Sequence, residues 1–323
     1  MGVTNFDVVQ AAAFIGSDFL TQGKTFFVKP RTGQDGSGGL SPRRGVKTLL
    51  KVLTDKVTAD QNDVVRFMAE GGSTDPSDTS DLLSATLDWN KNLVHLAGVS
   101  TGSPMGSRAR IGFASDYVGV GNLFTVSGRS CMFKDLLFNV DVASANPVGC
   151  VNVTGARNAF YRCQFAGMCH SLLDTTGNYS LRVSGYENYF KDCVIGTDTI
   201  TKGGGDNCEL LLAGGGRNIF EDCLIVTLAE ANTHQFVKRT AGDRFTLFKN
   251  CTFINVGTAS AGVAMLEAID VVSASGGNIV LRNCSLVGAA QWEAAPASGI
   301  VFSDGQVPAV GTGSGVMGAV TGA

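Results

Sequence analysis

The sequence predicts an all-β fold, a single-stranded right-handed parallel β-helix with a short N-terminal capping helix. Three observations lead to this prediction. A short motif ending in cysteine recurs without gaps at a spacing of 30 residues. The order of apolar residues inside the motif requires a sharp bend between strands. Glycine accounts for 42 of the 323 residues, which indicates many turns. Repeats of this length are typical of solenoids, in which each coil buries its apolar side against the next.

The repeat is clearest in the segments GARNAFYRC, GYENYFKDC and GGRNIFEDC. Each has glycine, asparagine and phenylalanine at the same distances before its final cysteine, and an apolar residue two positions after it. Looser copies follow at two further cysteines, and an earlier copy has Leu136 in the cysteine's place. We expect the cysteines to stack about 4.8 Å apart as small, buried, reduced core residues. This predicted cysteine ladder is Cys163, Cys193, Cys223, Cys251 and Cys284.

A bend must separate the phenylalanine from the cysteine in each copy. Side chains alternate between the two faces of a strand, yet these two apolar residues lie three positions apart. One residue in the left-handed backbone conformation would allow both to point inward, and aspartate and asparagine tolerate that conformation. The predicted bend positions directly precede each cysteine or its equivalent: Asp135, Arg162, Asp192, Asp222, Asn250 and Asn283.

The N-terminal region contains the segment FFVKPRTGQDGSGGLSPRRGVKTLLKVL. We expect a strand at Phe26 to Val28 and, after a glycine-rich loop, a short helix. Leu49, Leu50 and Leu53 fall at helical spacing and would close the open end of the coil stack. The predicted organisation is therefore an N-terminal arm (1–24), a first strand and capping helix (25–62), β-helix coils (63–300) and a C-terminal tail (301–323).

Both ends of the chain are expected to contact other subunits. The N-terminal arm carries many apolar residues and is the candidate anchor, through Phe6, Phe14 and Phe19. The coil repeat fades after Leu286, and from Val307 onward the tail has no strand periodicity and no charged side chain. Such a segment cannot bury enough apolar surface to order itself, so we expect a neighbouring subunit to order it.

Charge and composition argue against several partners. The formal net charge is −3, and no cluster of basic residues extends beyond Arg43 and Arg44, so a nucleic-acid partner is not expected. No signal peptide and no apolar stretch long enough for a membrane helix is evident, so we expect a soluble product made in a host cytoplasm. Nine cysteines without a C-x-x-C pair favour neither a zinc site nor a disulfide framework. No metal or cofactor is expected.

The coil motif, over roughly residues 90–290, resembles the pectate-lyase-like β-helix superfamily, and the segment from Phe26 to Leu53 resembles the beginning of many of its members. The first residues, MGVTNF, resemble those of β-helix proteins encoded among the virion genes of tailed phages. This resemblance implies a homotrimeric structural virion protein, most simply a capsid decoration or cement protein that contacts the major capsid protein or another virion protein. It places the protein on the capsid surface rather than in the tail.

Two hypotheses compete with this one: a host adhesin, which an export signal would favour, and a tail-associated receptor-binding spike that degrades polysaccharide. Glycoside hydrolysis needs two carboxylates about 5 to 10 Å apart. Asp192 and Asp222 would stack on adjacent coils, but asparagine fills the same position in later coils, so a bend role explains both without catalysis. No recognisable lyase motif surrounds Asp243, Arg244 and Glu221. No separate anchor or trimerisation domain is evident beside the coils, which also favours assembly over receptor cleavage.

The other side chains with functional potential are also expected to be structural. Tyr179, Tyr186 and Tyr189 form the one tyrosine cluster in the sequence and would pack against a loop or a neighbouring subunit. His95, His170 and His234 lie in unrelated contexts, and His95 falls in a predicted strand, where a hydrogen-bonded imidazole is expected. A disulfide between Cys163 and Cys169 is disfavoured because the chain is not expected to reach an oxidising compartment.

Overall fold

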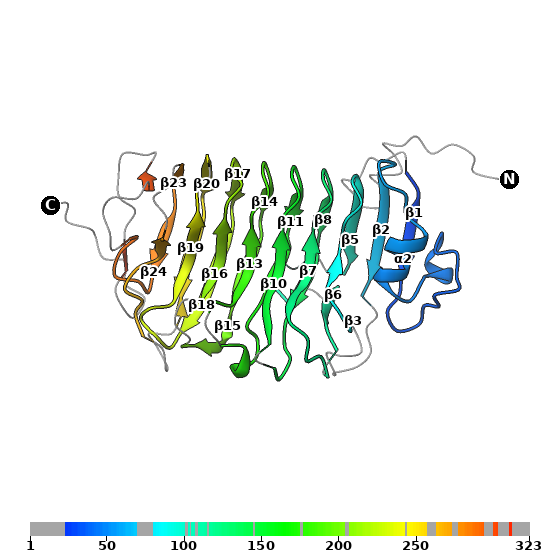
Figure 1. The fold of residues 1–323 in the computed structure, drawn as a ribbon, viewed down its shortest axis with the longest axis horizontal. Helices are drawn as coiled ribbons and strands as arrows, with labels where there is room; N and C mark the ends of the chain where they lie inside the picture. The colour runs from blue at the N-terminus through cyan, green and yellow to red at the C-terminus, as the bar shows by residue number, and fades with distance from the viewer. Residues whose placement is uncertain are drawn as a thin grey trace.

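The computed structural model is a right-handed parallel β-helix in which successive coils stack along one long axis (Figure 1). The structure describes residues 23–69, 80–100, 103, 105–106, 109–114, 116–144, 146–174, 177–203, 207–242, 244–256, 263–272, 277–293, 300–302 and 310–311. The predicted anchor residues Phe6, Phe14 and Phe19, and Asp243, lie outside this set. Within the described part of the chain, no helix is long and apolar enough to cross a membrane.

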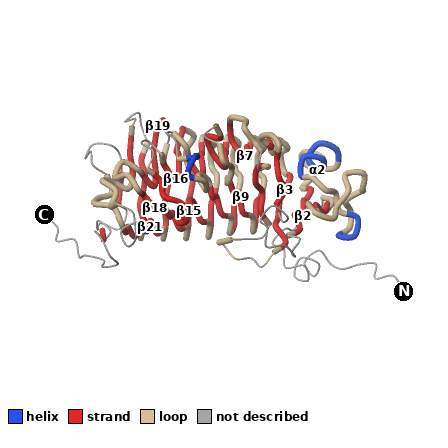
Figure 2. The backbone as a smooth tube through the Cα atoms, turned by 90° about the horizontal axis from the view of Figure 1, so that it is seen from below, coloured by secondary structure: helices blue, strands red, loops and turns tan. Residues whose placement is uncertain are grey.

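Three parallel sheets form the walls of the β-helix, and Figure 2 shows their strands side by side along the axis. Sheet A has ten strands: β1 (Thr25–Val28), β2 (Asp63–Met68), β5 (Val94–Val99), β8 (Met132–Lys134), β11 (Ala159–Tyr161), β14 (Tyr189–Lys191), β17 (Asn218–Glu221), β20 (Phe245–Lys249), β23 (Asn278–Arg282) and β25 (Ile300–Phe302).

Sheet B has nine strands: β3 (Ser80–Leu83), β6 (Arg110–Phe113), β9 (Leu137–Asn139), β12 (Gln164–Ala166), β15 (Val194–Lys202), β18 (Leu224–Ala229), β21 (Thr252–Asn255), β24 (Ser285–Val287) and β26 (Val310–Gly311). Sheet C has seven: β4 (Leu87–Asp88), β7 (Gly121–Val126), β10 (Pro147–Val153), β13 (Tyr179–Val183), β16 (Cys208–Ala213), β19 (Gln235–Ala241) and β22 (Ile269–Val271). The chain passes from sheet A to B to C within each coil.

From β8 to β24, the corner between sheets A and B is a single residue in the left-handed conformation. The structure places all six predicted bend positions there, with φ between 49° and 56°. The amide N–H of each of the first five bends donates to a carbonyl of the next coil, as Asp192 does to Glu221 at 3.1 Å. The corner therefore bends the strand without breaking the hydrogen bonding between coils.

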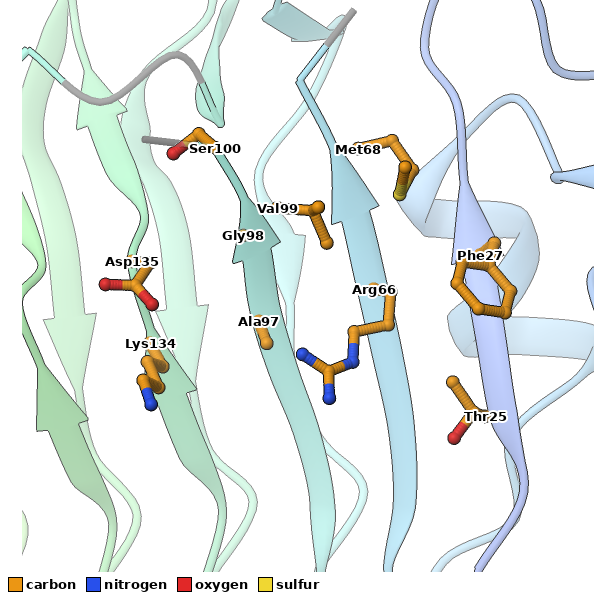
Figure 3. A pocket seen from close by; sticks show the side chains of 10 residues that line it. All are labelled: Thr25, Phe27, Arg66, Met68, Ala97, Gly98, Val99, Ser100, Lys134 and Asp135. Carbon is orange, nitrogen blue, oxygen red and sulfur yellow. The ribbon is translucent and has the colours of Figure 1, made fainter. Parts of the chain in front are cut away.

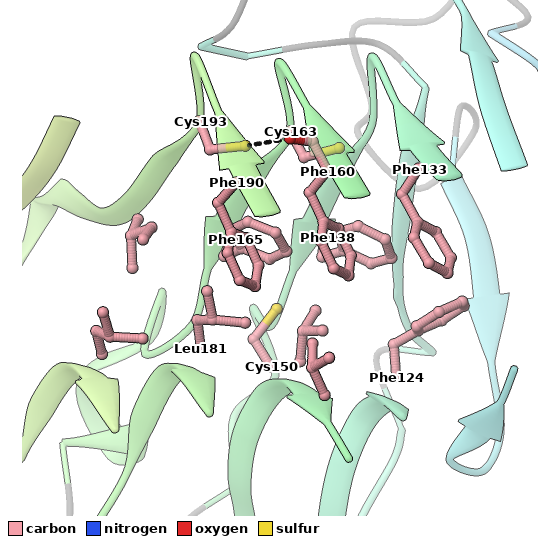
Figure 4. Packing of buried hydrophobic residues seen from close by; sticks show 14 of the residues in the cluster. Phe124, Phe133, Phe138, Cys150, Phe160, Cys163, Phe165, Leu181, Phe190 and Cys193 are labelled. Atoms are coloured by element: carbon pink, nitrogen blue, oxygen red, sulfur yellow. Dashed lines mark hydrogen bonds between the residues drawn. The ribbon is translucent and has the colours of Figure 1, made fainter. Parts of the chain in front are cut away.

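Phenylalanine side chains form a continuous column in the core. In sheet A, five of them stack face to face with ring centroids 4.5 to 4.9 Å apart. Figure 4 shows part of this column beside the phenylalanines of sheet B, such as Phe138 and Phe165, whose centroids are 5.8 Å apart. Offset aromatic stacking adds to the burial of apolar area, so each coil gives the next a matching surface. The column is Phe133, Phe160, Phe190, Phe220 and Phe248.

A helix closes the N-terminal end of the coil stack, as predicted. This helix, α2 (Leu49–Asp55), follows the 3₁₀ turn η1 (Pro42–Arg44), and Thr48 accepts a hydrogen bond from the Lys51 amide as its N-cap. One predicted contact is wrong, because Leu50 is 55% exposed and Val52 is buried with Leu49 and Leu53. Spacing alone could not separate these two residues, since either one completes a helical stripe with its neighbours.

The coil stack also extends further than the repeat indicates. Strand β1 pairs in register with β2, so the first strand is part of sheet A. After Leu286, β25 pairs with β23, and β26 pairs with β24. The tail has no strand periodicity from Val307 onward, yet the structure forms a short strand at Val310 and Gly311, and β25 extends across residue 300. Backbone pairing needs no side-chain repeat, which explains why the pattern ends before the sheets do.

Three buried asparagines link the coils at the corner between sheets C and A. The side-chain oxygen of each accepts the backbone N–H at the same position of the preceding coil: Asn188 accepts from Asn158 at 3.0 Å, and Asn218 accepts from Asn188 at 2.9 Å. Each side-chain NH₂ donates to a glycine carbonyl, from Asn188 to Gly155 at 3.1 Å. This asparagine ladder (Asn158, Asn188, Asn218) satisfies buried backbone groups that no strand partner reaches.

Candidate functional site

The cysteine ladder lies at the corner between sheets A and B, with side chains at most 7% exposed, and all nine cysteines of the chain are free. Each carbonyl of the ladder accepts the amide that follows the next cysteine, as Cys163 does from Val194 at 2.9 Å. In Figure 4 the Cys193 thiol points to the Phe160 carbonyl of the preceding coil, 3.5 Å away. Burial raises the pKa of the Cys193 and Cys223 thiols well above their usual value, so these thiols stay protonated and are not nucleophiles.

The bend residues form a second row, outside the core, and bond to one another along the axis. Arg162 makes two hydrogen bonds to the carboxylate of Asp135, at 2.7 and 2.9 Å. Asn250 donates to Asp222 at 2.9 Å, and Asn283 donates to Asn250 at 2.9 Å. A carboxylate that accepts hydrogen bonds from its neighbours along the corner has a structural role in the turn.

The outer face of sheet A carries a charged network beside this row. Glu221 accepts from Lys249 at 2.8 Å and from the Tyr189 hydroxyl at 2.7 Å, and Lys191 lies 3.3 Å from Asp222. The Lys249 hydrogen bond, followed by that of Tyr189, lowers the pKa of Glu221, which therefore stays ionised. Exposed ion pairs of this kind contribute little to stability.

The structure does not bring the three tyrosines together. Tyr179 is buried on β13 of sheet C, and its hydroxyl bonds to Asn122 at 2.5 Å. Tyr189 lies on β14 of sheet A, and Tyr186 is 51% exposed between the two. The cluster in the sequence is therefore not a cluster in space, because residues close in sequence are separated by a corner of the coil.

Two of the histidines have structural partners, and the third belongs to an unexpected group. The two ring nitrogens of His95 lie 3.3 Å from the Asn62 side-chain oxygen and 3.0 Å from the Met132 amide. His170 accepts from the Leu172 amide at 3.2 Å and caps the 3₁₀ turn η3 (Ser171–Leu173).

His234 is fully buried in a cluster of ionisable side chains at the corner between sheets B and C. This corner cluster is Lys202, Glu209 and His234, all with fully buried side chains. The Glu209 carboxylate lies 3.5 Å from the Lys202 Nζ and 3.5 Å from the His234 Nε2, and it accepts from the Ser180 hydroxyl at 2.6 Å. Burial opposes ionisation of Glu209, but Lys202, His234 and Ser180 together outweigh it and lower its pKa to about 2.

Sequence analysis missed this cluster. The three residues come from the end of β15, from β16 and from the turn before β19, and none of them belongs to the repeat. One signal was present, since Glu209 interrupts the otherwise apolar run of β16, CELLLA. A carboxylate in such a run needs a buried partner, which could have directed attention to nearby basic residues.

A groove with a volume of about 670 Å³ lies on the outer face of sheet B, beside the corner cluster. It crosses β6, β9, β12 and β15, and the segment from Thr197 to Ile200 forms one side. None of the described residues that line it is a phenylalanine, tyrosine or tryptophan. Its polar side chains include Arg110, Asn139, Asp141, Gln164, His170 and Asp198.

Cys169 connects the groove with the corner cluster. It lines the groove, and its thiol lies 3.2 Å from the Ala166 carbonyl. Burial raises its pKa to about 12, against the opposing effect of nearby Lys202, so it is a neutral thiol at physiological pH. Together with the burial of Cys163, this gives no support for a bond between the two cysteines, both of which are free.

A second, smaller hollow of about 290 Å³ lies on the outer face of sheet A near the N-terminal end (Figure 3). Phe27, Met68 and Val99 line it together with Arg66 and Asp135. Burial lowers the pKa of Arg66, and the Asp135 carboxylate opposes that effect. This carboxylate is also bonded to Arg162, so the polar groups of the hollow are engaged within the fold. Among the described residues, no group of histidine, cysteine, aspartate or glutamate is arranged to hold a metal ion.

Comparison with known proteins supports the fold. No family model matches the sequence, and no curated protein matches it. A pectate lyase structure aligns with a TM-score of 0.56 at 13% identity, over 83% of this chain and 64% of the lyase. A pectin methylesterase from Aspergillus niger aligns with a TM-score of 0.52 at 13% identity, over 90% of this chain and 84% of the esterase. The chain thus has a pectate-lyase-like β-helix fold and spans less than two thirds of that lyase.

A full-length tailspike protein from a bacteriophage of Escherichia coli also aligns, with a TM-score of 0.32 at 8% identity, over 69% of this chain and 39% of the tailspike. Similarity at this level carries no argument about either fold or function. The two enzyme structures share the architecture, and at 13% identity they leave the activity of this chain open.

Proposed function

We propose that this chain is a non-enzymatic structural protein of a tailed-phage virion, most simply a homotrimeric capsid decoration protein. The observation that carries the non-enzymatic part is the structural role of the two aspartates best placed for catalysis. Asp222 is bonded to Asn250 and lies 3.3 Å from the Lys191 Nζ. Asp192 and Asp222 both adopt the left-handed bend conformation that asparagine adopts in later coils. Each is explained by the architecture of the coil.

The virion part of the proposal rests on the opening residues MGVTNF and on the fold. A capped solenoid with a regular core is a stiff rod that suits a role in assembly. The homotrimer and the contact with a major capsid protein follow from the resemblance of the opening residues. Quantitative mass spectrometry of purified particles tests the location. A copy number comparable to that of the major capsid protein supports decoration, a few copies per particle indicate a tail component, and absence from particles overturns the proposal.

The N-terminal arm is the proposed anchor. Deleting residues 1–22 should leave a soluble β-helix that no longer sediments with particles, whereas deleting 307–323 should mainly weaken association between subunits. Co-sedimentation with particles and sedimentation velocity of the free protein measure the two effects. Binding of the arm-deleted protein at the wild-type level would refute the anchor assignment.

The alternative is a receptor-binding spike that cleaves polysaccharide, and the sheet B groove favours it, because Asp141 and Asp198 both line that groove. Release of reducing ends or of unsaturated products from capsular polysaccharides, lost in Asp198→Asn, would establish this activity. Product release that also disappeared in Asp192→Asn or Asp222→Asn would overturn the structural role proposed for the bends.

A further inference from the structure

The sheet B groove has the chemistry of a site for a ligand rich in hydroxyl groups. Its lining includes both hydrogen-bond acceptors and donors, with carboxylates at Asp141 and Asp198, a guanidinium at Arg110 and amides at Asn139 and Gln164. A hydroxyl group donates and accepts at once, so a polyol can satisfy such a mixed lining. Two carboxylates against one guanidinium leave an excess of negative charge when His170 is neutral, which disfavours an acidic ligand.

Buried groups hold the two sides of the groove in place. The Lys202 ammonium donates to the backbone carbonyls of Thr197 at 2.6 Å and Ile200 at 3.2 Å, from beneath the segment that forms one side. On the other side, the Gln164 side chain accepts from the Gly106 amide at 2.8 Å, although the two residues are 58 positions apart.

A charge buried this deeply is costly unless it is paired, and Glu209 supplies the pair. The corner cluster therefore fixes the shape of the groove before any ligand arrives. Such preorganisation lowers the entropy lost on binding.

We propose that the sheet B groove binds a neutral glycan chain, and that Lys202 is a positioning residue for it. The glycan hydroxyls bond to Asp141, Asp198 and Arg110, and the lysine acts only through the backbone of Thr197 and Ile200. Glycan binding goes beyond the proposed role in assembly and is compatible with it, because a structural particle protein can carry such a groove. It also differs from the alternative function, because a protein that binds a glycan need not cleave it.

Binding is measured by isothermal titration calorimetry of the full chain with malto- and cello-oligosaccharides as neutral probes and oligogalacturonates as acidic probes, and by a broad glycan array. Saturable binding of neutral glycans, with weaker binding of acidic ones, is the expected result. Asp141→Asn and Asp198→Asn should each weaken binding about tenfold, because each removes a charge-assisted hydrogen bond. Asp55→Asn, in the exposed last turn of α2, is the matched control and should bind like the wild type.

The role of Lys202 needs a variant that folds, because Lys202→Met alone leaves Glu209 buried without its cationic partner. The double variant Lys202→Met with Glu209→Gln removes both charges and preserves volume. We expect it to keep its far-ultraviolet circular dichroism spectrum and to lose about tenfold in glycan affinity. A folded double variant that binds like the wild type would overturn the positioning role.

Three other outcomes would overturn the site itself. These are no saturable binding of any neutral glycan, preferential binding of oligogalacturonates, and binding that neither groove variant changes. None of them bears on the copy number in particles, so failure here can be distinguished from failure of the proposed assembly role.

Discussion

The two corners that flank sheet B are built in different ways. At the corner between sheets A and B, the six coils from β8 to β24 each use one left-handed residue and one buried apolar residue, so that these successive coils are nearly identical. At the corner between sheets B and C, the connections vary in length, and one of them encloses Lys202, Glu209 and His234. Repetition gives the first corner its stability, whereas the second depends on a single electrostatic arrangement. Loops with freedom to vary are where binding sites arise on rigid scaffolds.

The two corners should differ most in how much the free energy of unfolding falls when a charged side chain is removed. Glu209→Ala leaves Lys202 buried without its anionic partner, so the free energy of unfolding should fall by about 3 to 5 kcal/mol, or the protein should fail to fold. Urea denaturation followed by circular dichroism measures this change. Glu187→Ala is the control, since Glu187 pairs on the surface with Arg157 and Arg217, and a loss of about 1 kcal/mol or less is expected there. Equal losses in the two variants would contradict the distinction.

Acid should also destabilise the protein by protonating particular buried groups. The pKa of Glu209 is about 2 in the fold, below its ordinary value of 4.5. Its contribution to stability is therefore fully present above pH 4.5 and is lost as the pH falls toward 2. His95 acts in a higher window, because burial lowers its pKa from 6.5 to about 4, and the unfolded chain takes up its proton first.

A series of urea denaturations across this pH range separates the two effects. Between pH 4.5 and 2, the Lys202→Met, Glu209→Gln double variant should show a flatter dependence of unfolding free energy on pH than the wild type. The wild-type slope between pH 6.5 and 4 contains the contribution of His95, whose surroundings the double variant leaves unchanged. A wild-type slope in the double variant over the lower range would show that Glu209 is not the titrating group.

A smaller effect is expected in the cysteine ladder. Cys193→Ser places a hydroxyl in a site that offers the Sγ only long contacts to the Phe160 and Lys191 carbonyls, so the free energy of unfolding should fall by about 1 to 3 kcal/mol. Cys193→Ala serves as the comparison, because it loses the sulfur without burying a polar group. If the serine variant were as stable as the wild type, the ladder position would not be an apolar environment.

The smallest effect is expected at the bends. Asp192→Asn keeps a side chain that tolerates the left-handed backbone, as Asn250 and Asn283 show in the same position, so the free energy of unfolding should change by about 0.5 kcal/mol or less. Asp192→Val is the informative comparison, since a β-branched residue is strained at φ 53° and should be clearly destabilising. Comparable stability of the two variants would exclude backbone conformation as the reason for aspartate here.

What could be predicted from the sequence follows the same division between corners. The cysteines, the phenylalanine column and the bends recur at fixed spacing, so each copy of the repeat supports the structural role predicted for the others. The asparagines were visible in that repeat too, but their hydrogen bonds between coils depend on backbone positions that spacing does not give.

Features that occur only once were missed or misplaced. The corner cluster depends on contacts among three segments that share no pattern, and the sheet B groove depends on the path of a single strand, β15. At the N-terminal end, Leu50 and Val52 are two positions apart and point to nearly opposite sides of α2, and only packing against the coils decides which of them is buried.

The closure of one end by α2 has a consequence for how the protein is made. Each coil rests on the coil before it, so a growing chain can add finished coils in the order of synthesis. The segment that contains α2 leaves the ribosome before the coils do, and it buries Leu49, Val52 and Leu53 against the first of them. The starting coil therefore offers one apolar face, toward the chain still to come. We therefore expect the rod to grow in one direction, with the apolar surface at its growing end limited to the cross-section of a single coil.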